Sequence, residues 1–438
     1  MERLSPPGVR PVEALSRWRR PAEEMHMSDL PEELTPGERI RIMRERRGMT
    51  RPVLAGLVGR STDWLKKIES GERAISSHAI LLRLAFALDV TDLSVLTGPA
   101  GAAQPVSTGR LFHPASTAIW STLLERGTRP PAPVPAGMTS ATYAADVDAG
   151  WRLWHQAANN RTAVGNIAPD LIRHGESLAR SAGGDDRRTA LVGLASAYRL
   201  AQQVIAYIGP AEAVWMLGDR AMAAAADADD PAAMGAAAWN LANTMRAVGE
   251  HEGAMLMVTT AADRLRPHLA DGPQHWRGLY GALHLHAAIT EARDGRDGMA
   301  WNHWDTADEV AKSLPAGYTE LSTVFGRANV DLHAVSVSTE LRSSGKALSL
   351  ADEIDPDSIP STERRTRLWV DAARSHMHRG DRTAALHVMG IALRISPETV
   401  RFTPQARSVA AELWRKSPRA MRAETLELAE AVGITTGV

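Results

Sequence analysis

The 438-residue sequence predicts an all-α protein, built from a small helical bundle followed by a long array of helix pairs. Two observations support this prediction. Residues 50 to 71 show two short helical patterns on either side of a glycine break, with capping residues at both starts. From about residue 139 onward the chain is rich in alanine, and one spacing of glycine and alanine recurs along it.

The stretch from Thr50 to Gly71 is the best-defined element of the sequence. Thr50 is a good N-cap, and Pro52 falls in a first helical turn, where its missing N–H costs nothing. Gly59 ends this helix, and Ser61 caps a second helix that stops at Gly71. The pattern therefore predicts two short helices joined by a tight turn.

The second helix separates into two faces when it is wound at about 3.6 residues per turn. Leu65 and Ile68 fall on the apolar face, with Trp64 beside them. The opposite face, here called the roof, consists of Thr62, Asp63, Lys66, Lys67 and Ser70. A short, rigidly held helix with a polar and basic roof fits the major groove of B-DNA. The alternative is an ordinary amphipathic surface helix whose charges are merely solvated.

The pattern around these helices resembles the XRE family, the phage-repressor and Cro type of helix-turn-helix regulator. That family shows, in order, Leu-Thr-Gln, Leu-Ala, Gly-x-Ser and Ile-x-x-Ile-Glu-x-Gly. The corresponding segments here are Met49-Thr50-Arg51, Leu54-Ala55, Gly59-Arg60-Ser61, and Leu65 followed by Ile68-Glu69 and Gly71. Arg51 replaces the usual Gln, and Trp64 is large for this helix. The resemblance implies a five-helix λ-repressor-like domain that binds double-stranded DNA.

The balance of charge within this domain is positive, although the whole chain has a formal net charge of −1. Basic residues outnumber acidic ones between residues 35 and 74, as contact with DNA phosphates requires. We therefore expect Arg44, Arg47 and Arg73 to hold phosphates while the roof faces base edges. Arg51 and Ser61 complete the predicted DNA-contacting set.

Composition predicts four segments. Residues 1–34 are rich in Pro, Glu and Arg without a sustained period, and we expect a disordered leader. Residues 35–98 form the DNA-binding domain. Residues 99–138, which are punctuated by proline, are predicted to be a linker with one helix within 119–126. Residues 139–438 form a helical repeat domain.

Three segments of the repeat domain share a Gly, an Ala five residues later and an Ala seven residues further. They are Gly249-Ala254-Ala261, Gly295-Ala300-Ala307 and Gly380-Ala385-Ala392, with looser copies near Gly209 and residues 343–348. A glycine fits the turn between two antiparallel helices, and small alanines let those helices approach closely. Each pair leaves an apolar side bare, so the pairs must stack into a superhelix. The pattern resembles tetratricopeptide repeats with longer loops.

Superhelices of this type bind peptides or small ligands on the face lined by the first helix of each pair. The predicted ligand-binding residues are Trp239, Asn243, Arg246, Asn329 and His333. Asn can hydrogen-bond a peptide backbone, and Arg can pair with a carboxylate. The stretch around Asn329 also resembles one in actinomycete regulators with this domain arrangement. For each residue the alternative is a capping or interhelix role.

No pattern indicates an enzyme, a cofactor or a metal site. The chain has no cysteine, which excludes disulfides and thiolate zinc sites. His284 and His286 are two residues apart, as are His376 and His378, so each pair points to different helix faces. No HExxH, P-loop or nucleophile-elbow pattern occurs. No apolar run approaches membrane-spanning length, and we expect a cytoplasmic protein without a membrane partner.

These expectations describe a sequence-specific transcriptional regulator that binds DNA as a homodimer. The resemblance extends to the peptide-sensing RRNPP regulators of Gram-positive bacteria. It implies that the repeat domain dimerises, senses a signalling peptide or small-molecule ligand, or does both. The alternative is an interaction scaffold whose repeats bind a protein partner.

Overall fold

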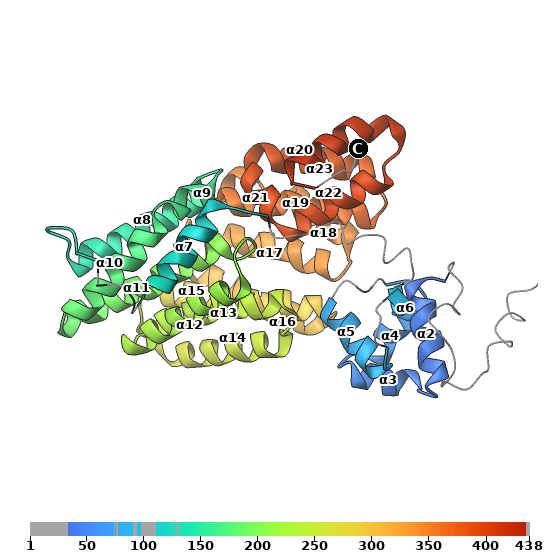
Figure 1. Ribbon diagram of the computed structural model, residues 1–438, viewed down its shortest axis with the longest axis horizontal. Helices are drawn as coiled ribbons and strands as arrows, with labels where there is room; N and C mark the ends of the chain where they lie inside the picture. The colour runs from blue at the N-terminus through green and yellow to red at the C-terminus, as the bar shows by residue number, and fades with distance from the viewer. Residues whose placement is uncertain are drawn as a thin grey trace, which may run out of the picture. The chain divides into compact units, whose positions relative to one another are not determined.

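The computed structural model describes residues 34–73, 75, 78–90, 94–97, 111–126, 128, 130 and 132–434. The leader predicted for residues 1–34 lies outside this part of the chain, except for its last residue. The chain divides into two compact units, Met1–Pro105 and Val106–Val438. The described residues form helices and no strand, so the predicted all-α fold class is confirmed (Figure 1).

The first unit is a small helical bundle. Its described helices are α2 (Pro36–Arg46), α3 (Arg51–Leu57), α4 (Thr62–Glu69), α5 (His78–Ala87) and α6 (Ser94–Thr97). They enclose one apolar core that includes the fully buried Ile40, Leu54, Leu65, Leu84 and Leu96. α3 and α4 are the two helices that the sequence predicts on either side of the glycine break.

The turn between α3 and α4 follows the predicted signals. Gly59 and Gly71 adopt left-handed backbone conformations, with φ values of +69° and +78°. The Ser61 hydroxyl accepts a hydrogen bond from the Trp64 backbone N–H at 3.1 Å, which caps the start of α4. Thr50 occupies the N-cap position of α3, but its side chain makes no capping hydrogen bond.

The second unit is an array of packed helices, seen from teal to red in Figure 1. It comprises α7 (Pro114–Glu125), α8 (Ser140–Gln156), α9 (Asn160–Gly165), α10 (Ala168–Ser181), α11 (Gly184–Ile205), α12 (Ala211–Asp227), α13 (Pro231–Ala247), α14 (His251–Leu265), η3 (Arg266–His268), α15 (Gln274–Arg293), α16 (Asp297–Ser313), α17 (Arg327–Glu340), α18 (Ser344–Glu353), η4 (Pro356–Ser358), α19 (Thr362–His378), α20 (Arg382–Ile395), α21 (Pro397–Phe402), α22 (Pro404–Lys416), η5 (Arg419–Met421) and α23 (Arg422–Ala431). Successive helices pack as pairs, and α11, α13, α15, α17 and α19 also contact one another in series.

The repeated spacing marks the helix pairs as predicted. Gly249, Gly295 and Gly380 lie in the turns of the pairs α13/α14, α15/α16 and α19/α20, with φ values of +88°, +76° and +80°. The alanines that follow are packed inside, and those with no exposed surface are Ala254, Ala300, Ala307, Ala385 and Ala392. Gly209, in a looser copy, lies between α11 and α12. The prediction of stacked helix pairs is confirmed.

The α17/α18 pair makes the same turn without a glycine, and so does the connection from α12 to α13, where Asp229 has a φ of +49°. Between α17 and α18, Arg342 adopts a φ of +62°, in the place that glycine takes in the other pairs. The Ser343 N–H donates to the Ser338 carbonyl at 2.8 Å, as the Asp381 N–H donates to the His376 carbonyl at 3.0 Å. The turn geometry is therefore retained, with a side chain in a region of backbone space that favours glycine.

The linker predicted for residues 99–138 requires correction. Ile119 and Leu123 of α7 are buried in the same core as α8 to α12, and the Ser177 hydroxyl donates to the Ala132 carbonyl at 2.8 Å. Prolines dominate the composition of this stretch, but the apolar residues between them recur at helical spacing and pack. A fragment that begins at residue 139 would therefore lack part of its own core.

The two ends of the helical array meet. Helices α8 and α9 contact α19 and α21, and we call this contact the seam. The Thr362 hydroxyl donates to the Gln156 carbonyl at 3.0 Å, and the Arg161 backbone N–H donates to the Glu398 carboxylate at 2.6 Å. The seam joins residues that are more than two hundred positions apart. The array is thus closed on itself rather than open.

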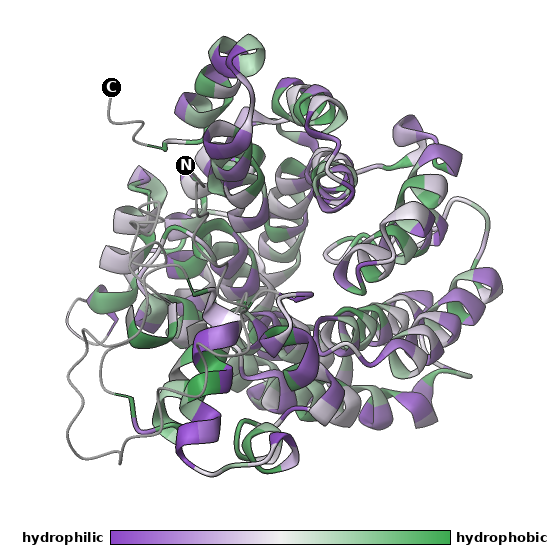
Figure 2. Ribbon diagram, turned by 90° about the vertical axis from the view of Figure 1, so that its right-hand side faces the viewer, coloured by the Kyte–Doolittle hydropathy of each residue, from purple (hydrophilic) through white to green (hydrophobic). Residues whose placement is uncertain are grey.

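The helices of both units contain hydrophilic as well as hydrophobic residues. Figure 2 shows hydrophilic and hydrophobic residues interleaved along most of them. In the described part of the chain, no helix has the length and apolar character that crossing a membrane requires.

Candidate functional site

The roof predicted on α4 lies on the surface. All five of its residues are exposed: Thr62, Asp63, Lys66, Lys67 and Ser70. Beneath them Trp64, Leu65 and Ile68 are buried in the core of the first unit. Gly37 of α2 approaches α4 so closely that an added Cβ would lie 2.1 Å from the Ile68 carbonyl oxygen. The roof is therefore presented on a helix that its neighbour holds tightly.

The two lysines of the roof have different surroundings. The Lys67 ammonium lies 2.9 Å from the Asp63 carboxylate, one turn earlier on the helix. The hydrogen bond from Lys67, together with its charge, lowers the pKa of Asp63. Lys66 has no ion pair within the described residues. Because lysine can donate to O6 and N7 of guanine, Lys66 is the better placed of the two to reach a base edge.

Arg44, which the sequence predicts to hold phosphates, is not exposed for such a contact. It is a buried residue, and its Nη2 and the Arg51 Nε donate to the Glu69 carboxylate at 3.1 and 2.6 Å. The Arg44 Nη1 also donates to the Met49 carbonyl at 2.8 Å. Arg44 lies one helical turn from the buried Ile40, on the inward side of α2, and its side chain is buried for this reason.

Glu69 is the residue of this domain that the sequence interpretation missed. Burial raises the pKa of its carboxyl, but hydrogen bonds from Arg44 and Arg51 outweigh burial, and the pKa of Glu69 is lowered. The carboxylate therefore joins the ends of α2, α3 and α4 through charged hydrogen bonds. The Ile-Glu pattern at the end of α4 was the available signal, because a glutamate flanking an apolar helix face needs a buried partner.

The remaining candidates keep an outward or partly outward position. Arg47 is exposed and lies 2.7 Å from the Asp89 carboxylate. Arg73 is partly buried, and Arg51 remains partly exposed despite its bond to Glu69. Ser61 is committed to capping α4 through its hydroxyl. Of the predicted DNA-contacting set, the roof and Arg47 are thus exposed, and Arg51 and Arg73 are partly exposed.

The second unit contains a polar cavity of about 240 Å³. Its wall includes four of the five predicted ligand-binding residues: Trp239, Asn243, Arg246 and His333. These come from α13 and α17, two helices that do not follow each other in the chain. The fifth, Asn329, is buried away from this cavity, and its amide donates to the Thr323 carbonyl at 3.4 Å. Asn329 thus contacts the loop that precedes α17 and does not line this cavity.

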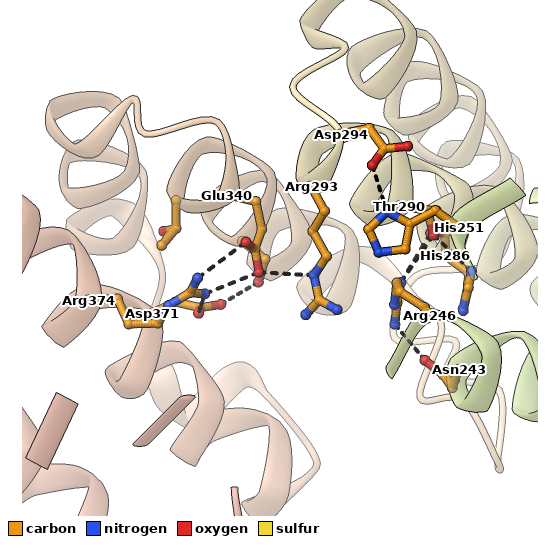
Figure 3. A network of polar contacts seen from close by, with 12 residues as sticks. Asn243, Arg246, His251, His286, Thr290, Arg293, Asp294, Glu340, Asp371 and Arg374 are labelled. Carbon is orange, nitrogen blue, oxygen red and sulfur yellow. Dashed lines mark hydrogen bonds and ion pairs between the residues drawn. The ribbon is translucent and has the colours of Figure 1, made fainter. Parts of the chain in front are cut away.

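Arg246 is held in the cavity wall by neutral partners. Its guanidinium donates to the Asn243 side chain, and to the His286 carbonyl at 3.2 Å (Figure 3). Burial lowers the pKa of Arg246 to about 9, and the nearby charge of Arg293 adds to this effect. No carboxylate in the described residues forms an ion pair with Arg246. It therefore presents a positive charge with neutral hydrogen-bond partners.

A paired cluster lies next to Arg246. Figure 3 shows the Arg293 side chain between Arg246 and the Glu340 carboxylate. The Arg293 Nε and the Arg374 Nη2 donate to Glu340 at 3.3 and 3.2 Å, and Arg374 also contacts Asp371 at 2.9 Å. Burial raises the pKa of Glu340, but the charges of Arg374 and Arg293 lower it well below its usual value. These arginines, unlike Arg246, are neutralised within the protein.

His333 is a neutral member of the wall. Its Nδ1 donates to the Asn329 carbonyl at 2.7 Å, so its Nε2 is an unprotonated acceptor. Burial lowers the pKa of His333 to about 3, and the charge of Arg364 acts in the same direction. The cavity wall therefore combines charged donors with neutral imidazoles.

The sequence interpretation missed the other cationic residues of this wall. Arg161 of α9 and Arg364 and Arg367 of α19 reach the cavity across the seam. Arg161 lies outside the repeated spacing, and the spacing that marks the α19/α20 pair does not show that Arg364 and Arg367 face the cavity. Only the closure of the array brings them beside Arg246.

The fold and its two sites define a class of protein: a helix-turn-helix module, which is a DNA-binding element, joined to an array of helical repeats. A family model described as "Helix-turn-helix domain" matches residues 37–95. No curated protein matches the chain. The structure described as "Crystal structure of BtubC (BKLC) from P. vanneervenii" is 13% identical, covers 52% of this chain and 88% of its own, and has a TM-score of 0.36.

Proposed function

We propose that this protein is a sequence-specific DNA-binding transcriptional regulator of the XRE type, and that it binds its operator as a homodimer. The observation that carries the proposal is the roof of α4, which is exposed, basic and mounted on a helix fixed by the buried Glu69 pairs. An element of this kind enters the major groove with its polar side chains against base edges.

In this mechanism the side chains divide the work. Lys66 reads guanine O6 and N7, while Asp63 accepts from cytosine N4 or stays paired with Lys67. Arg47 and Arg73 hold phosphates, which fixes the register without reading sequence. Two-fold symmetry of a homodimer places the half-sites ~34–36 Å apart, or a multiple of that distance.

The repeat domain is the regulatory part of the proposal. A ligand or a protein contact that favours one arrangement of the paired repeat domains changes the half-site spacing that the dimer can span. This part is supported by the polar cavity in the second unit, which gathers Asn243, Arg246 and His333.

The test begins with the full chain and a random DNA library. We expect enrichment of a two-fold symmetric sequence, and mapped genomic sites that contain it. On the enriched operator, Lys66→Ala should weaken binding by ~1–3 kcal/mol, about 5- to 150-fold, and should relax the preference at one base. Lys416→Ala, an exposed lysine of α22 in the second unit, is the matched control and should bind normally.

Two outcomes separate the alternatives. An equal loss for Lys66→Ala on the operator and on random DNA would make Lys66 a phosphate contact. Failure to enrich any sequence, with recovery of one stoichiometric protein from the cells, would contradict the regulator and favour the interaction scaffold.

A further inference from the structure

We propose that the inner cavity of the second unit binds a compact polyanion, a small molecule that carries phosphate or several carboxylate groups. Binding at this site is independent of DNA recognition, and only its regulatory consequence rests on the proposed function.

The wall has a large excess of positive charge. Five arginines line the cavity in the described part of the chain, against a single carboxylate, Glu363. The arginines are Arg161, Arg246, Arg293, Arg364 and Arg367. Glu363 is shared by Arg364 and Arg367, and Arg293 is paired with Glu340 just outside the wall. Arg161 and Arg246 have no ion pair of their own among the described residues.

Two of these guanidinium groups retain unsatisfied donors. The Arg161 Nε is buried without a hydrogen-bond partner in the described structure, and the Arg364 Nε lies 3.6 Å from the Glu363 carboxylate, beyond hydrogen-bond distance. Arg161 as a whole is only 2% exposed, and it is surrounded by the rings of Trp154, Tyr207 and Phe402. An unpartnered buried donor is unfavourable, more so when it is charged, so the free protein leaves part of this positive charge incompletely satisfied.

The protein carries an electrostatic strain that an anion would relieve. Burial lowers the pKa of Arg161 to about 10, although the charge of Glu363 opposes this effect and that of Arg367 adds to it. Burial also lowers the pKa of Arg246 to about 9, and the charge of Arg293 adds to this effect. Both groups nevertheless remain protonated near neutral pH. Anions are stabilised where several desolvated guanidinium groups converge, because Arg pairs with phosphate or carboxylate through two parallel hydrogen bonds.

The rest of the wall favours a compact ligand. The three histidines that line it, His155, His286 and His333, all have lowered pKa values because they are buried, so they add hydrogen-bonding atoms rather than charge. The volume of about 240 Å³ lies just below the ~300–1,000 Å³ usual for small-molecule pockets. A compact polyanion fits this space, whereas a long peptide does not.

The position of the cavity gives the ligand a way to act. Arg161 and His155 come from the first side of the seam, and Glu363, Arg364 and Arg367 come from the other. An anion held by Arg161 and Arg364 at once therefore bridges helices α9 and α19 and favours the closed array. Removal of the anion leaves the like charges to repel one another across the seam.

The site is tested by isothermal titration calorimetry on the full chain without DNA. The probes are inorganic pyrophosphate, which represents phosphate ligands, and citrate, which represents carboxylate ligands, with glycerol as a neutral probe. We expect one molecule of pyrophosphate or citrate to bind per chain, and no heat from glycerol. The stronger of the two anions identifies the source of the negative charge.

Variants locate the binding. Arg161→Gln and Arg364→Gln should each weaken it about tenfold or more. Arg264→Gln, an exposed arginine on α14, is the matched control and should leave binding unchanged. Glu363→Gln removes the one competing carboxylate and should tighten binding, a gain that a variant with mere folding damage would not produce. Circular dichroism of each variant checks that the helices are intact.

The outcomes are distinct. No binding of either anion, or binding that persists in Arg161→Gln and Arg364→Gln, would overturn the proposal. Loss of binding in Lys66→Ala would place the anion on the DNA-binding face and would also overturn it. If the anion binds in the cavity but no operator is ever found, the cavity site stands and the proposed function fails.

Discussion

The two units present their functional groups in opposite ways. In the first unit, the roof belongs to one helix of eight residues, and its charged groups point outward. In the second unit, the cationic groups point inward and come from α9, α13, α15 and α19, which span more than two hundred positions of the chain. An exposed face needs only a helix and a support. A cavity needs the whole array to close.

The same contrast holds for buried arginines. Arg44 is buried with a carboxylate partner, Glu69, and stabilises the mounting of the roof. Arg161 and Arg246 are enclosed without such a partner. The first arrangement is complete in the free protein, whereas the second leaves an opening for a ligand. A buried charge that has its partner within the protein indicates a structural role, whereas a buried charge without one indicates a binding site.

The largest difference between the two units should be in how much folding stability each loses as the pH falls. Burial lowers the pKa of His155 to about 4 and of His333 to about 3, and it holds that of His286 well below its usual value. The unfolded chain takes up these protons near pH 6.5, and the folded chain does not. The second unit should therefore lose about 1.4 kcal/mol per histidine for each pH unit as the pH falls from 6.5 toward 4.

The first unit should lose stability at a lower pH than the second unit. The pKa of Glu69 is lowered in the folded state, so its contribution is present above the unfolded value of about 4.5 and is lost only as the pH falls through the folded value. Urea unfolding between pH 7 and pH 5, with limited proteolysis to show which unit opens, checks this order. His155→Gln should flatten the pH dependence, and the exposed His387→Gln should not. A first unit that opens before the second would contradict the comparison.

Removal of a complete buried pair should produce the next largest effect. Arg44→Ala leaves the Glu69 carboxylate buried with Arg51 alone, and we expect a loss of ~3–5 kcal/mol from the first unit. Arg41→Ala breaks an exposed pair with Glu45 on the same helix and should cost only ~0–1 kcal/mol. Hydrogen exchange of peptides from α2 to α4 measures both. Equal effects of the two variants would show that the buried pair does not support the roof.

The turns of the helical array should produce the smallest effects. Gly380→Ala introduces a side chain at a φ of +80° where no atom would contact it, so only the backbone is strained, and we expect a loss of about 1 kcal/mol. Arg342→Gly relieves the same strain in the α17/α18 turn and should gain up to about 1 kcal/mol. Thermal unfolding of the full chain tests both. Two losses of equal size would show that the Arg342 side chain stabilises its turn.

Local features of both units could be predicted from the sequence. Gly59 forms the break before α4, Ser61 caps its start and Gly71 follows its end. Each of these residues affects only its near neighbours in the chain. The glycine and alanine spacing likewise determined three helix pairs. Capping, turn formation and helical periodicity depend on near neighbours in the chain, so the residues alone report them.

Only the tertiary structure decided which faces meet. The charge pattern assigned Arg44 to phosphates and did not reveal that Glu69 is its buried partner. Composition suggested a linker where α7 completes a core. Helical spacing relates Asn243 to Arg246 on α13, but it does not show that Arg161 and Arg364 line the same cavity from the two sides of the seam. Contacts between positions far apart in the chain depend on how the whole array curves. That curvature is the sum of many small packing angles, which no single segment of sequence contains.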